Sequence, residues 1–375
     1  MIYLYVALGC VAILVAPLAI LIRILALRVL STQPRRKALE ARGVGKSVQF
    51  PSNDQTTAVG RYGLWFGENF EQHALVGAVN DQDLRKVVRQ VVKSTAAVPT
   101  EPFIAQLTGH TLSGPADIDP NWQNVDVPLR DGTSAPAWLF PGASAASRWV
   151  IHIQGIRTSR RVALRSVEVV ERAGLTSLVI TYRGAGDGPS EGLSALGQRE
   201  WTDLADAIGY ARAHGAVGID VVAWSMGAGL AFELLRRDPQ AFDRLALIAP
   251  ATDWSGIVQH GIQKAGLPSF LAPVVSWAMG SDVASRLIGM SSPLDFRRLN
   301  WSENFWLTVP TLVLHSRGDD EIPFHLTEVF ASNHETVSLV ETASAPHGWE
   351  ANVDPERFES TLAAWLDARY PNGTQ

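Results

Sequence analysis

Three residues in the second half of the chain have the types and the order that nucleophilic catalysis requires. Ser225 stands in the run Ala-Trp-Ser-Met-Gly (223–227), Asp319 follows an apolar run, and His347 lies in the run Ala-Pro-His-Gly-Trp (345–349). A serine hydroxyl becomes a good nucleophile when a base removes its proton, and that base needs a carboxylate to orient it. The sequence therefore predicts that Ser225 attacks, that His347 acts as general base and then general acid, and that Asp319 orients His347.

Ser225 lies where a strand rich in β-branched residues is expected to meet a helix. The small residues Ala223, Gly227 and Gly229 allow the close approach of a sharp strand-to-helix turn. Such a turn presents a serine hydroxyl in a strained, exposed position. The alternative is that Ser225 only caps the start of the helix, which is a common role of serine.

The elements that must position these residues alternate between short apolar runs and amphipathic helices from residue 125 onward. This alternation predicts an α/β fold with a mainly parallel sheet flanked by helices. A hairpin is expected first, with its turn at residues 131–132. The expected strands are 125–129, 135–140, 149–153, 177–182, 220–224, 245–248, 311–314 and 337–340, and the expected helices are 159–173, 198–213, 226–237, 323–331 and 355–370.

The strand rhythm stops between about residues 253 and 306. This stretch is rich in aromatic residues and is too long for a loop inside a compact unit. We expect a helical cap inserted into a catalytic domain that spans residues 121–375.

With these motifs in place, residues 125–370 resemble the α/β-hydrolase superfamily. The resemblance implies the α/β-hydrolase fold and a serine hydrolase with Ser225, Asp319 and His347 as its catalytic residues. It also implies an oxyanion hole made by two backbone N–H groups, that of Met226 and one from the loop 153–156, for which we expect Ile156.

The sequence departs from the superfamily pattern at two positions. Ala223 replaces the usual first glycine, and Gln154 stands where many members have histidine. Two carboxylates other than Asp319 could supply the acid, because Asp320 is its neighbour and Asp253 occupies another place from which some members draw theirs. His152 lacks the late position expected of the base.

No cofactor and no metal are expected. The glycine-rich run 182–190 has Pro189 at the third glycine position of a dinucleotide fingerprint, and the run 43–47 lacks the first glycine of a phosphate-binding loop. Cys10 is the single cysteine, which excludes an intrachain disulfide, and none of the nine histidines pairs with another at ligand spacing. Isolated histidines such as His260 are expected to be solvated or structural.

The N-terminus carries an uncharged stretch at residues 2–22, which as a helix would span about 30 Å, the thickness of a bilayer core. The sequence predicts a transmembrane anchor over residues 1–30 and membrane lipid as its partner. Basic residues follow this stretch and none precedes it, so the expected localisation is a single-pass cell-membrane protein with a cytoplasmic catalytic domain. A buried helix and a cleaved signal peptide are the alternatives.

Residues 31–120 read as a basic juxtamembrane segment followed by an N-terminal extension. A hairpin is expected from residues 61–66 and 74–79, then an amphipathic helix over 81–93, then a linker rich in proline and glycine over 99–120. Residues 1–50 hold seven basic residues and one acidic residue, whereas the whole chain has a net charge of -5. The remainder is therefore acidic and would repel a phosphate backbone, so nucleic acid is not expected as a partner.

These observations predict a serine hydrolase that cleaves carboxylic esters or thioesters of apolar acyl groups through an acyl-enzyme. Trp224 and Met226 flank the nucleophile, and the expected cap adds further aromatic residues, so the substrate is expected to be a small-molecule or lipid-like ester. A peptidase of the same fold and a catalytically silent binding protein are the alternatives.

Overall fold

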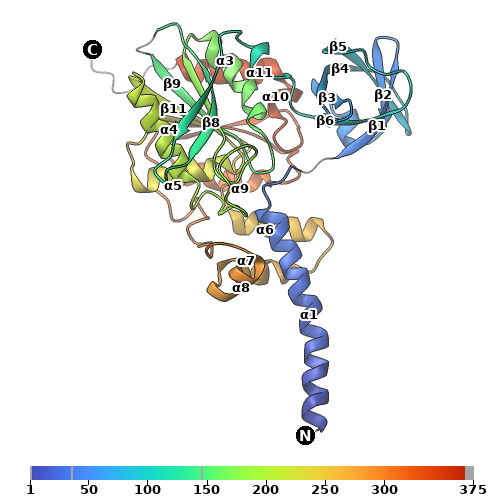
Figure 1. Cartoon of the computed structure of the whole chain (residues 1–375), viewed down its shortest axis with the longest axis vertical. Helices are drawn as coiled ribbons and strands as arrows, with labels where there is room; N and C mark the ends of the chain where they lie inside the picture. The colour runs from blue at the N-terminus through green and yellow to red at the C-terminus, as the bar shows by residue number, and fades with distance from the viewer. Residues whose placement is uncertain (1, 35–36, 145–146, 368–375) are drawn as a thin grey trace.

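The computed structural model describes residues 2–34, 37–144 and 147–367, with side chains from residue 16 onward. A large α/β body carries a smaller β-barrel on one side and the long helix α1 (Ile2–Leu30) below (Figure 1). Residues 368–370, the end of the last predicted helix, lie outside the described residues.

The α/β body is built on an eight-stranded sheet in the order β14-β13-β12-β11-β9-β10-β8-β7. The strands β9 to β14 run parallel, and β8 pairs antiparallel with both β10 and β7. The predicted hairpin and the six further strands are confirmed. The bounds are β7 (Gln123–Pro128), β8 (Ser134–Phe140), β9 (Arg148–Ile153), β10 (Thr176–Ile180), β11 (Gly218–Trp224), β12 (Arg244–Ile248), β13 (Thr311–Ser316) and β14 (Val337–Thr342).

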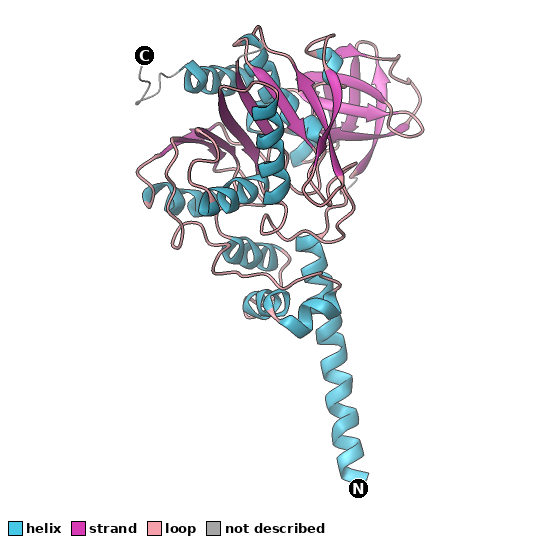
Figure 2. Ribbon diagram, turned by 60° about the vertical axis from the view of Figure 1, so that its left-hand side comes forward, coloured by secondary structure: helices cyan, strands magenta, loops and turns pink. Residues whose placement is uncertain are grey.

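Helices cover both faces of this sheet because alternate residues of its central strands are buried on opposite sides (Figure 2). Val150, Val222 and Leu312 pack with α3 (Leu164–Arg172) and α11 (Pro355–Asp367). The residues next to them in the strands pack on the other face with α4 (Trp201–Ala213), α5 (Gly227–Arg237) and α9 (Phe324–Ser332). Short turns of helix complete the body: η1 (Pro115–Asp117), η2 (Arg160–Ala163) and α10 (Glu350–Val353).

Three helices lie between β12 and β13, where the sequence predicted a helical insertion. They are α6 (Trp254–Lys264), α7 (Leu271–Gly280) and α8 (Asp282–Ile288). The C-terminal part of α1 packs against α7 and α8, and its residues Leu25, Ala26 and Leu30 are buried in the main core.

Among the residues whose side chains are described, no helix combines the length and the apolar character needed to cross a membrane. On this finding the predicted localisation, a single-pass membrane protein with a cytoplasmic catalytic domain, is wrong, and a lipid partnership through α1 is not supported. The described part of α1 includes Arg23 and Arg28, and it packs against protein through its buried apolar residues. The side chains of residues 2–15 lie outside the description.

A closed six-stranded antiparallel barrel precedes the α/β body, in the order β1-β2-β5-β4-β3-β6. The predicted hairpin of β3 and β4 is confirmed, whereas part of the predicted linker forms β6. The barrel comprises β1 (Ala38–Val44), β2 (Ser47–Pro51), β3 (Tyr62–Phe66), β4 (Gln72–Gln82), β5 (Lys86–Ser94) and β6 (Phe103–Thr108), with the short helix α2 (Asp54–Thr57) between β2 and β3.

The predicted helix over residues 81–93 is wrong, because this stretch is the end of β4, a turn and β5. Val87 and Arg89 are buried in the barrel, whereas Val92 is exposed and Leu84, at the turn, is 99% exposed. A run of valines fits both a helical and a strand period, and β-branched residues favour the strand. Arg89 is accommodated inside because its guanidinium donates hydrogen bonds to four backbone carbonyls, those of Thr56, Ala58, Gly60 and Gly77.

Candidate active site

Ser225 occupies a strained turn between β11 and α5. Its φ is 52°, in the left-handed region that non-glycine residues rarely adopt, and its N–H donates to the carbonyl of Ile248 over 2.9 Å. A Cβ on Gly227 would lie 2.9 Å from the carbonyl oxygen of Gln154, so glycine is needed there for the helix to approach the neighbouring loop. The turn therefore holds the Ser225 hydroxyl outward at the carboxyl end of the sheet.

The three predicted catalytic side chains lie in one hydrogen-bonded chain. His347 Nε2 is 2.9 Å from Ser225 Oγ, and His347 Nδ1 is 2.6 Å from Asp319 Oδ2. In the neutral imidazole, Nδ1–H donates to the carboxylate and Nε2 accepts the serine proton. These residues come from the ends of β11, β13 and β14, which meet at the same edge of the sheet.

The two alternative acids point elsewhere. Asp320 forms an ion pair with Lys264 Nζ over 2.5 Å, and Asp253 caps α6 by accepting the N–H of Ser255. Asp320 also accepts a hydrogen bond from the backbone of His347, but among the three carboxylates considered from the sequence Asp319 is the one that contacts the imidazole of His347.

A second imidazole on Asp319 was missed by the sequence reasoning. His315 is fully buried, and its Nε2 lies 3.0 Å from Asp319 Oδ2, while its Nδ1 lies 2.9 Å from Thr327 Oγ1. Because an ionised carboxylate only accepts, Nε2–H donates to Asp319, and in the neutral imidazole Nδ1 then accepts the hydroxyl proton of Thr327. The spacing of four residues between His315 and Asp319, at the end of a buried strand, was the available signal.

The other carboxylate oxygen of Asp319 accepts the backbone N–H groups of Glu321 and Ile322. Burial raises the pKa of Asp319. The charge of His347 and the hydrogen bonds from the two imidazoles lower it by more than burial raises it, so the pKa lies well below its usual value. Burial lowers the pKa of His347, but the charge and hydrogen bond of Asp319 outweigh it and raise that pKa to about 9. The pair is therefore arranged to stabilise an imidazolium.

Glu350 adds a buried carboxyl group close to the hydrogen-bonded series of Ser225, His347 and Asp319. It is 1% exposed, and neither of its oxygens has a hydrogen-bond partner among the described residues. Burial raises the pKa of Glu350 to about 8. Ligand atoms of His315, Asp319 and Glu350 lie within 4.8 Å of one another. We assign no metal to this cluster, because the two histidine nitrogens and two backbone amides already occupy the oxygens of Asp319.

The two expected oxyanion donors belong to Met226, which follows Ser225 in the chain, and to Ile156, which lines the same pocket as Ser225. Within the described part of the chain, no protein acceptor is found for the N–H of Met226 or of Ile156. A Cβ on Gly155 would lie 2.9 Å from the Cβ of Ser225, which shows how closely the loop approaches the nucleophile. Tyr182 holds this loop by donating its hydroxyl proton to the carbonyl of Gly155 over 3.0 Å.

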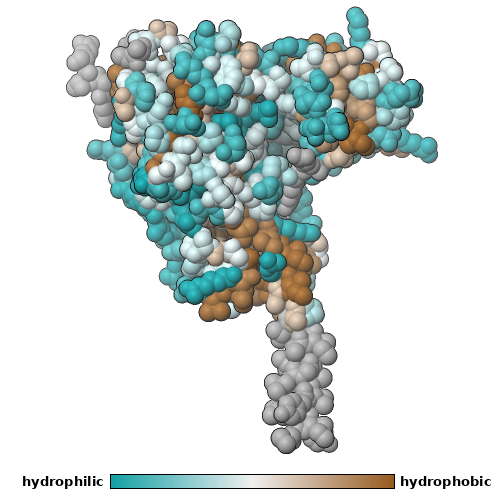
Figure 3. Space-filling model, in the orientation of Figure 1, coloured by the Kyte–Doolittle hydropathy of each residue, from teal (hydrophilic) through white to brown (hydrophobic). Residues whose placement is uncertain are grey.

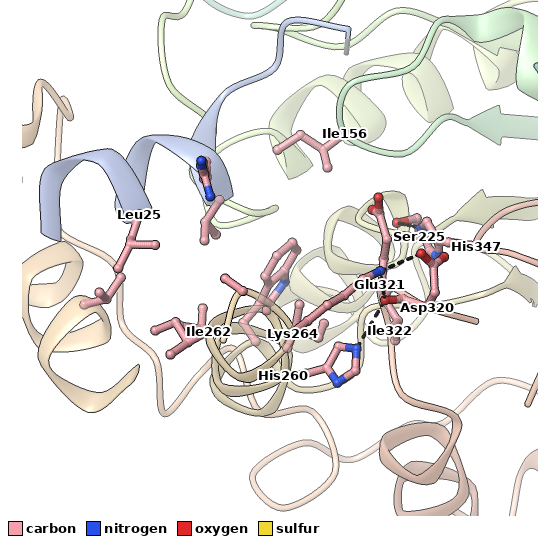
Figure 4. Close-up of a pocket in the computed structure, with 18 of the residues that line it drawn as sticks. Leu25, Ile156, Ser225, His260, Ile262, Lys264, Asp320, Glu321, Ile322 and His347 are labelled. Carbon is pink, nitrogen blue, oxygen red and sulfur yellow. Dashed lines mark hydrogen bonds and ion pairs between the residues drawn. The ribbon is translucent and has the colours of Figure 1, made fainter. Parts of the chain in front are cut away.

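A pocket of about 260 Å³ opens beside Ser225 and His347 (Figure 4). Its walls come from α1, from the loop that carries Ile156, from α6 and α7, and from the segment after β13. The apolar lining residues are Leu25, Val29, Ile156, Trp254, Ile257, Val258, Ile262, Val275 and Ile322. The charged residues of the lining are Arg28, Arg157, Lys264, Asp320 and Glu321.

Apolar residues also gather on the surface over α7, α8 and the adjoining part of α1 (Figure 3). Phe270, Trp277, Val283 and Leu287 are each at least 65% exposed. The surface close to the pocket is therefore apolar as well.

Two histidines weighed from the sequence lie apart from the reacting chain. His152 is fully buried between Ser166 and Ser177. His260 lines the pocket, and its Nε2 lies 3.2 Å from the carbonyl oxygen of Asp320.

Comparisons with known proteins separate the two parts of the chain. Residues 38–102, the barrel strands up to β6, match the family described as "Domain of unknown function (DUF8805)". No curated protein matches the sequence.

Solved structures of esterases cover about two thirds of the chain. The esterase Pf2001 of Pyrococcus furiosus is 19% identical with a TM-score of 0.52, over 68% of this chain and 94% of that protein. Est1E of Butyrivibrio proteoclasticus is 13% identical with a TM-score of 0.48, over 65% and 97%. An esterase from Exiguobacterium antarcticum is 18% identical with a TM-score of 0.46, over 66% and 100%.

At these identities the likeness to Pf2001 establishes the fold alone. The chain has the α/β-hydrolase fold, to which it adds a six-stranded barrel and the helix α1.

Proposed function

We propose that the protein is a serine hydrolase that cleaves carboxylic esters or thioesters of apolar acyl groups. The observation that carries the proposal is the hydrogen-bonded chain of Ser225, His347 and Asp319 at the mouth of an apolar pocket. The structural neighbour Pf2001, which is an esterase, supports ester hydrolysis as the general reaction.

The reaction begins when Ser225 Oγ attacks the carbonyl carbon of the substrate and its proton moves to His347 Nε2. The carbonyl oxygen becomes an oxyanion, for which the N–H groups of Met226 and Ile156 are the proposed donors. Collapse of this intermediate breaks the bond to the alcohol or thiol, which leaves with the proton from His347. Ser225 then carries the acyl group.

Water completes the cycle by attacking this acyl-enzyme. His347 takes a proton from the water and returns it to Ser225 Oγ when the second intermediate collapses, which releases the carboxylic acid. Asp319 remains ionised throughout and stabilises the imidazolium that forms twice per turnover.

The pocket suits an acyl chain better than a polar group. Seven of its apolar lining residues come from α1, α6 and α7, namely Leu25, Val29, Trp254, Ile257, Val258, Ile262 and Val275. A hydrocarbon chain of medium length would cover these apolar surfaces, and each Å² of apolar surface removed from water would favour binding by roughly 25 cal/mol.

Substrate profiling tests this proposal. We expect p-nitrophenyl esters and acyl thioesters of medium chain length to be hydrolysed faster than the acetate, and Ser225→Ala to abolish both activities. Efficient cleavage of peptidyl amides with negligible ester turnover would instead make the protein a peptidase. No turnover of any substrate by the folded protein would favour a silent binding protein.

A further inference from the structure

We propose that the N-terminal barrel is a positioning module for the active site, with Asn352 as the residue that ties the loop of His347 to it. The inference rests on the proposed serine-hydrolase function and assigns a task to the barrel that the reaction itself does not require. It follows from contacts between segments that are far apart in the sequence.

Asn352 lies in α10, five residues after His347, and is fully buried. Its Nδ2 donates to the carbonyl of Arg61 over 2.6 Å and to that of Gly109 over 3.0 Å. In return, the N–H of Arg61 donates to the carbonyl of Asn352 over 3.0 Å. Arg61 immediately precedes β3 and Gly109 immediately follows β6, so three hydrogen bonds join α10 to two adjacent barrel strands.

Trp349 adds an apolar contact between the segment around α10 and the barrel. Its ring centroid lies 4.5 Å from that of Tyr62, and it packs against the barrel core. A single residue, Gly348, separates Trp349 from His347, so a shift of this ring moves the backbone that carries the imidazole.

Arg165 connects the segment around α10 to the strand that ends at the nucleophile. It donates to Asn352 Oδ1 and, over 3.0 Å, to the carbonyl of Gly348, and its guanidinium lies 4.5 Å from the ring centroid of Trp224. Trp224 precedes Ser225. The buried cation therefore spans from the histidine loop to the strand that ends in the serine.

The segment after β6 also reaches the loop of the proposed oxyanion donor. His110 Nε2 lies 3.3 Å from Thr158 Oγ1, and the carbonyl of Ser113 accepts a hydrogen bond from Arg161 Nε over 3.1 Å. Residues 109–113 thus contact the histidine loop at Asn352 and the loop of Ile156 at Thr158. The barrel holds both catalytic loops from one side, and displacement of a reacting group by about 1 Å can cost on the order of 100-fold in rate.

Two glycines in this segment give a matched test. A Cβ on Gly109 would lie 3.0 Å from both Asn352 Oδ1 and Trp349 Cδ1, whereas a Cβ on Gly114 would meet nothing within 4 Å. The φ of Gly114 is -177°, which any residue adopts. Gly109→Val therefore places additional side-chain atoms against Asn352 and Trp349, where α10 meets the barrel. Gly114→Val makes the same change five residues further along the chain, where no atom lies close.

Asn352→Asp gives an independent probe, because it keeps an oxygen for Arg165 and removes the two donors to barrel carbonyls. We expect Gly109→Val and Asn352→Asp to lower kcat for p-nitrophenyl acetate by about tenfold or more, with KM changed less than about threefold. We expect the acid limb of the pH profile to move down toward the ordinary pKa of histidine, because the imidazole loses its contact with Asp319. Gly114→Val should match the wild type in all three quantities.

Hydrogen exchange of residues 343–353 in the full-length protein supplies a readout besides activity, and it should be faster in the first two variants alone. If a folded Gly109→Val protein keeps the wild-type kcat, pH profile and exchange rates, the positioning role is wrong. Loss of activity with an unshifted pH profile and unchanged exchange would also overturn it. A wild type without hydrolase activity would overturn the proposed function instead, and the exchange comparison would still decide whether the barrel orders the loop.

Discussion

Asp319 is held by four N–H donors, two from imidazoles and two from the backbone. These four hydrogen bonds hold both carboxylate oxygens in place and favour the ionised form. The types and order of the three reacting residues were readable from the sequence. The role of His315 was not established by its spacing of four residues from Asp319, because the folded strand and turn are needed to bring its ring against the same oxygen.

Asp319→Asn should lower kcat by about 10⁴-fold with little loss of stability, because the amide favours the wrong histidine tautomer. Asp253→Asn serves as the control, since its carboxylate caps a helix, and Asp320→Asn tests the neighbouring acid, which pairs with Lys264 and lines the pocket. Steady-state kinetics of the three variants decides the assignment, and a larger loss at Asp253 would reverse it.

His315→Gln should lower kcat by about tenfold while Ser225 stays intact, because one of the donors that fix Asp319 is lost or displaced. Thr327→Val should have a smaller effect in the same direction, since it removes only the partner of His315 Nδ1. Equal kcat for wild type and His315→Gln would show that His315 is a packing residue.

The pH dependence of kcat/KM should rise through an apparent pKa above 6.5, because Asp319 raises the pKa of His347 to about 9 and the base must be neutral to act. Initial rates measured between pH 5 and 10 on an ester without ionisable groups give this value. An inflection below 6.5 would contradict the charge arrangement described for the pair.

Glu350 gives a stability prediction with a definite sign. Its pKa is about 8 in the folded protein against 4.5 ordinarily, so between these values the folded state binds more protons and the free energy of unfolding falls as pH rises. Glu350→Gln should weaken this fall. Denaturant unfolding of both proteins at pH 5 and pH 8 measures the change in the free energy of unfolding between the two pH values. An equal change in the wild type and in Glu350→Gln would mean that Glu350 ionises normally.

The helix α1 forms one wall of the pocket through Leu25 and Val29, although it precedes the α/β body in the chain. The sequence predicted a helix here and assigned its apolar side to lipid. Apolar residues suit a bilayer and a protein groove equally well, so composition alone did not distinguish the two environments.

Val29→Trp should reduce kcat/KM for long acyl esters by about tenfold or more and leave the acetate nearly unaffected, because the larger ring fills the acyl pocket. Ile24→Trp is the control, since Ile24 is 45% exposed on the same helix and does not line the pocket. Measuring kcat/KM of the two variants for esters of graded acyl-chain length tests whether α1 lines the acyl pocket. Identical profiles would remove α1 from the substrate site.

At the scale of the whole molecule, the α/β body followed from local signals and the barrel did not. Apolar runs such as 311–314 identify their own strands, and the alternation with helices specifies a parallel sheet. The barrel closes by pairing β1 with β6, about sixty residues apart, and Arg89 sits inside it, contrary to the usual pattern of buried residues. The tie between Arg61 and Asn352 spans 291 residues and leaves no local trace.

The central claim is that Ser225 is an activated nucleophile, and labelling with a fluorophosphonate followed by mass spectrometry of the intact and digested protein tests it most directly. The account predicts one adduct per chain, located on Ser225, formed by the wild type and absent from Ser225→Ala, with His347→Ala labelled far more slowly. Equal labelling of the wild type and Ser225→Ala, or no labelling of a correctly folded wild type, would contradict it.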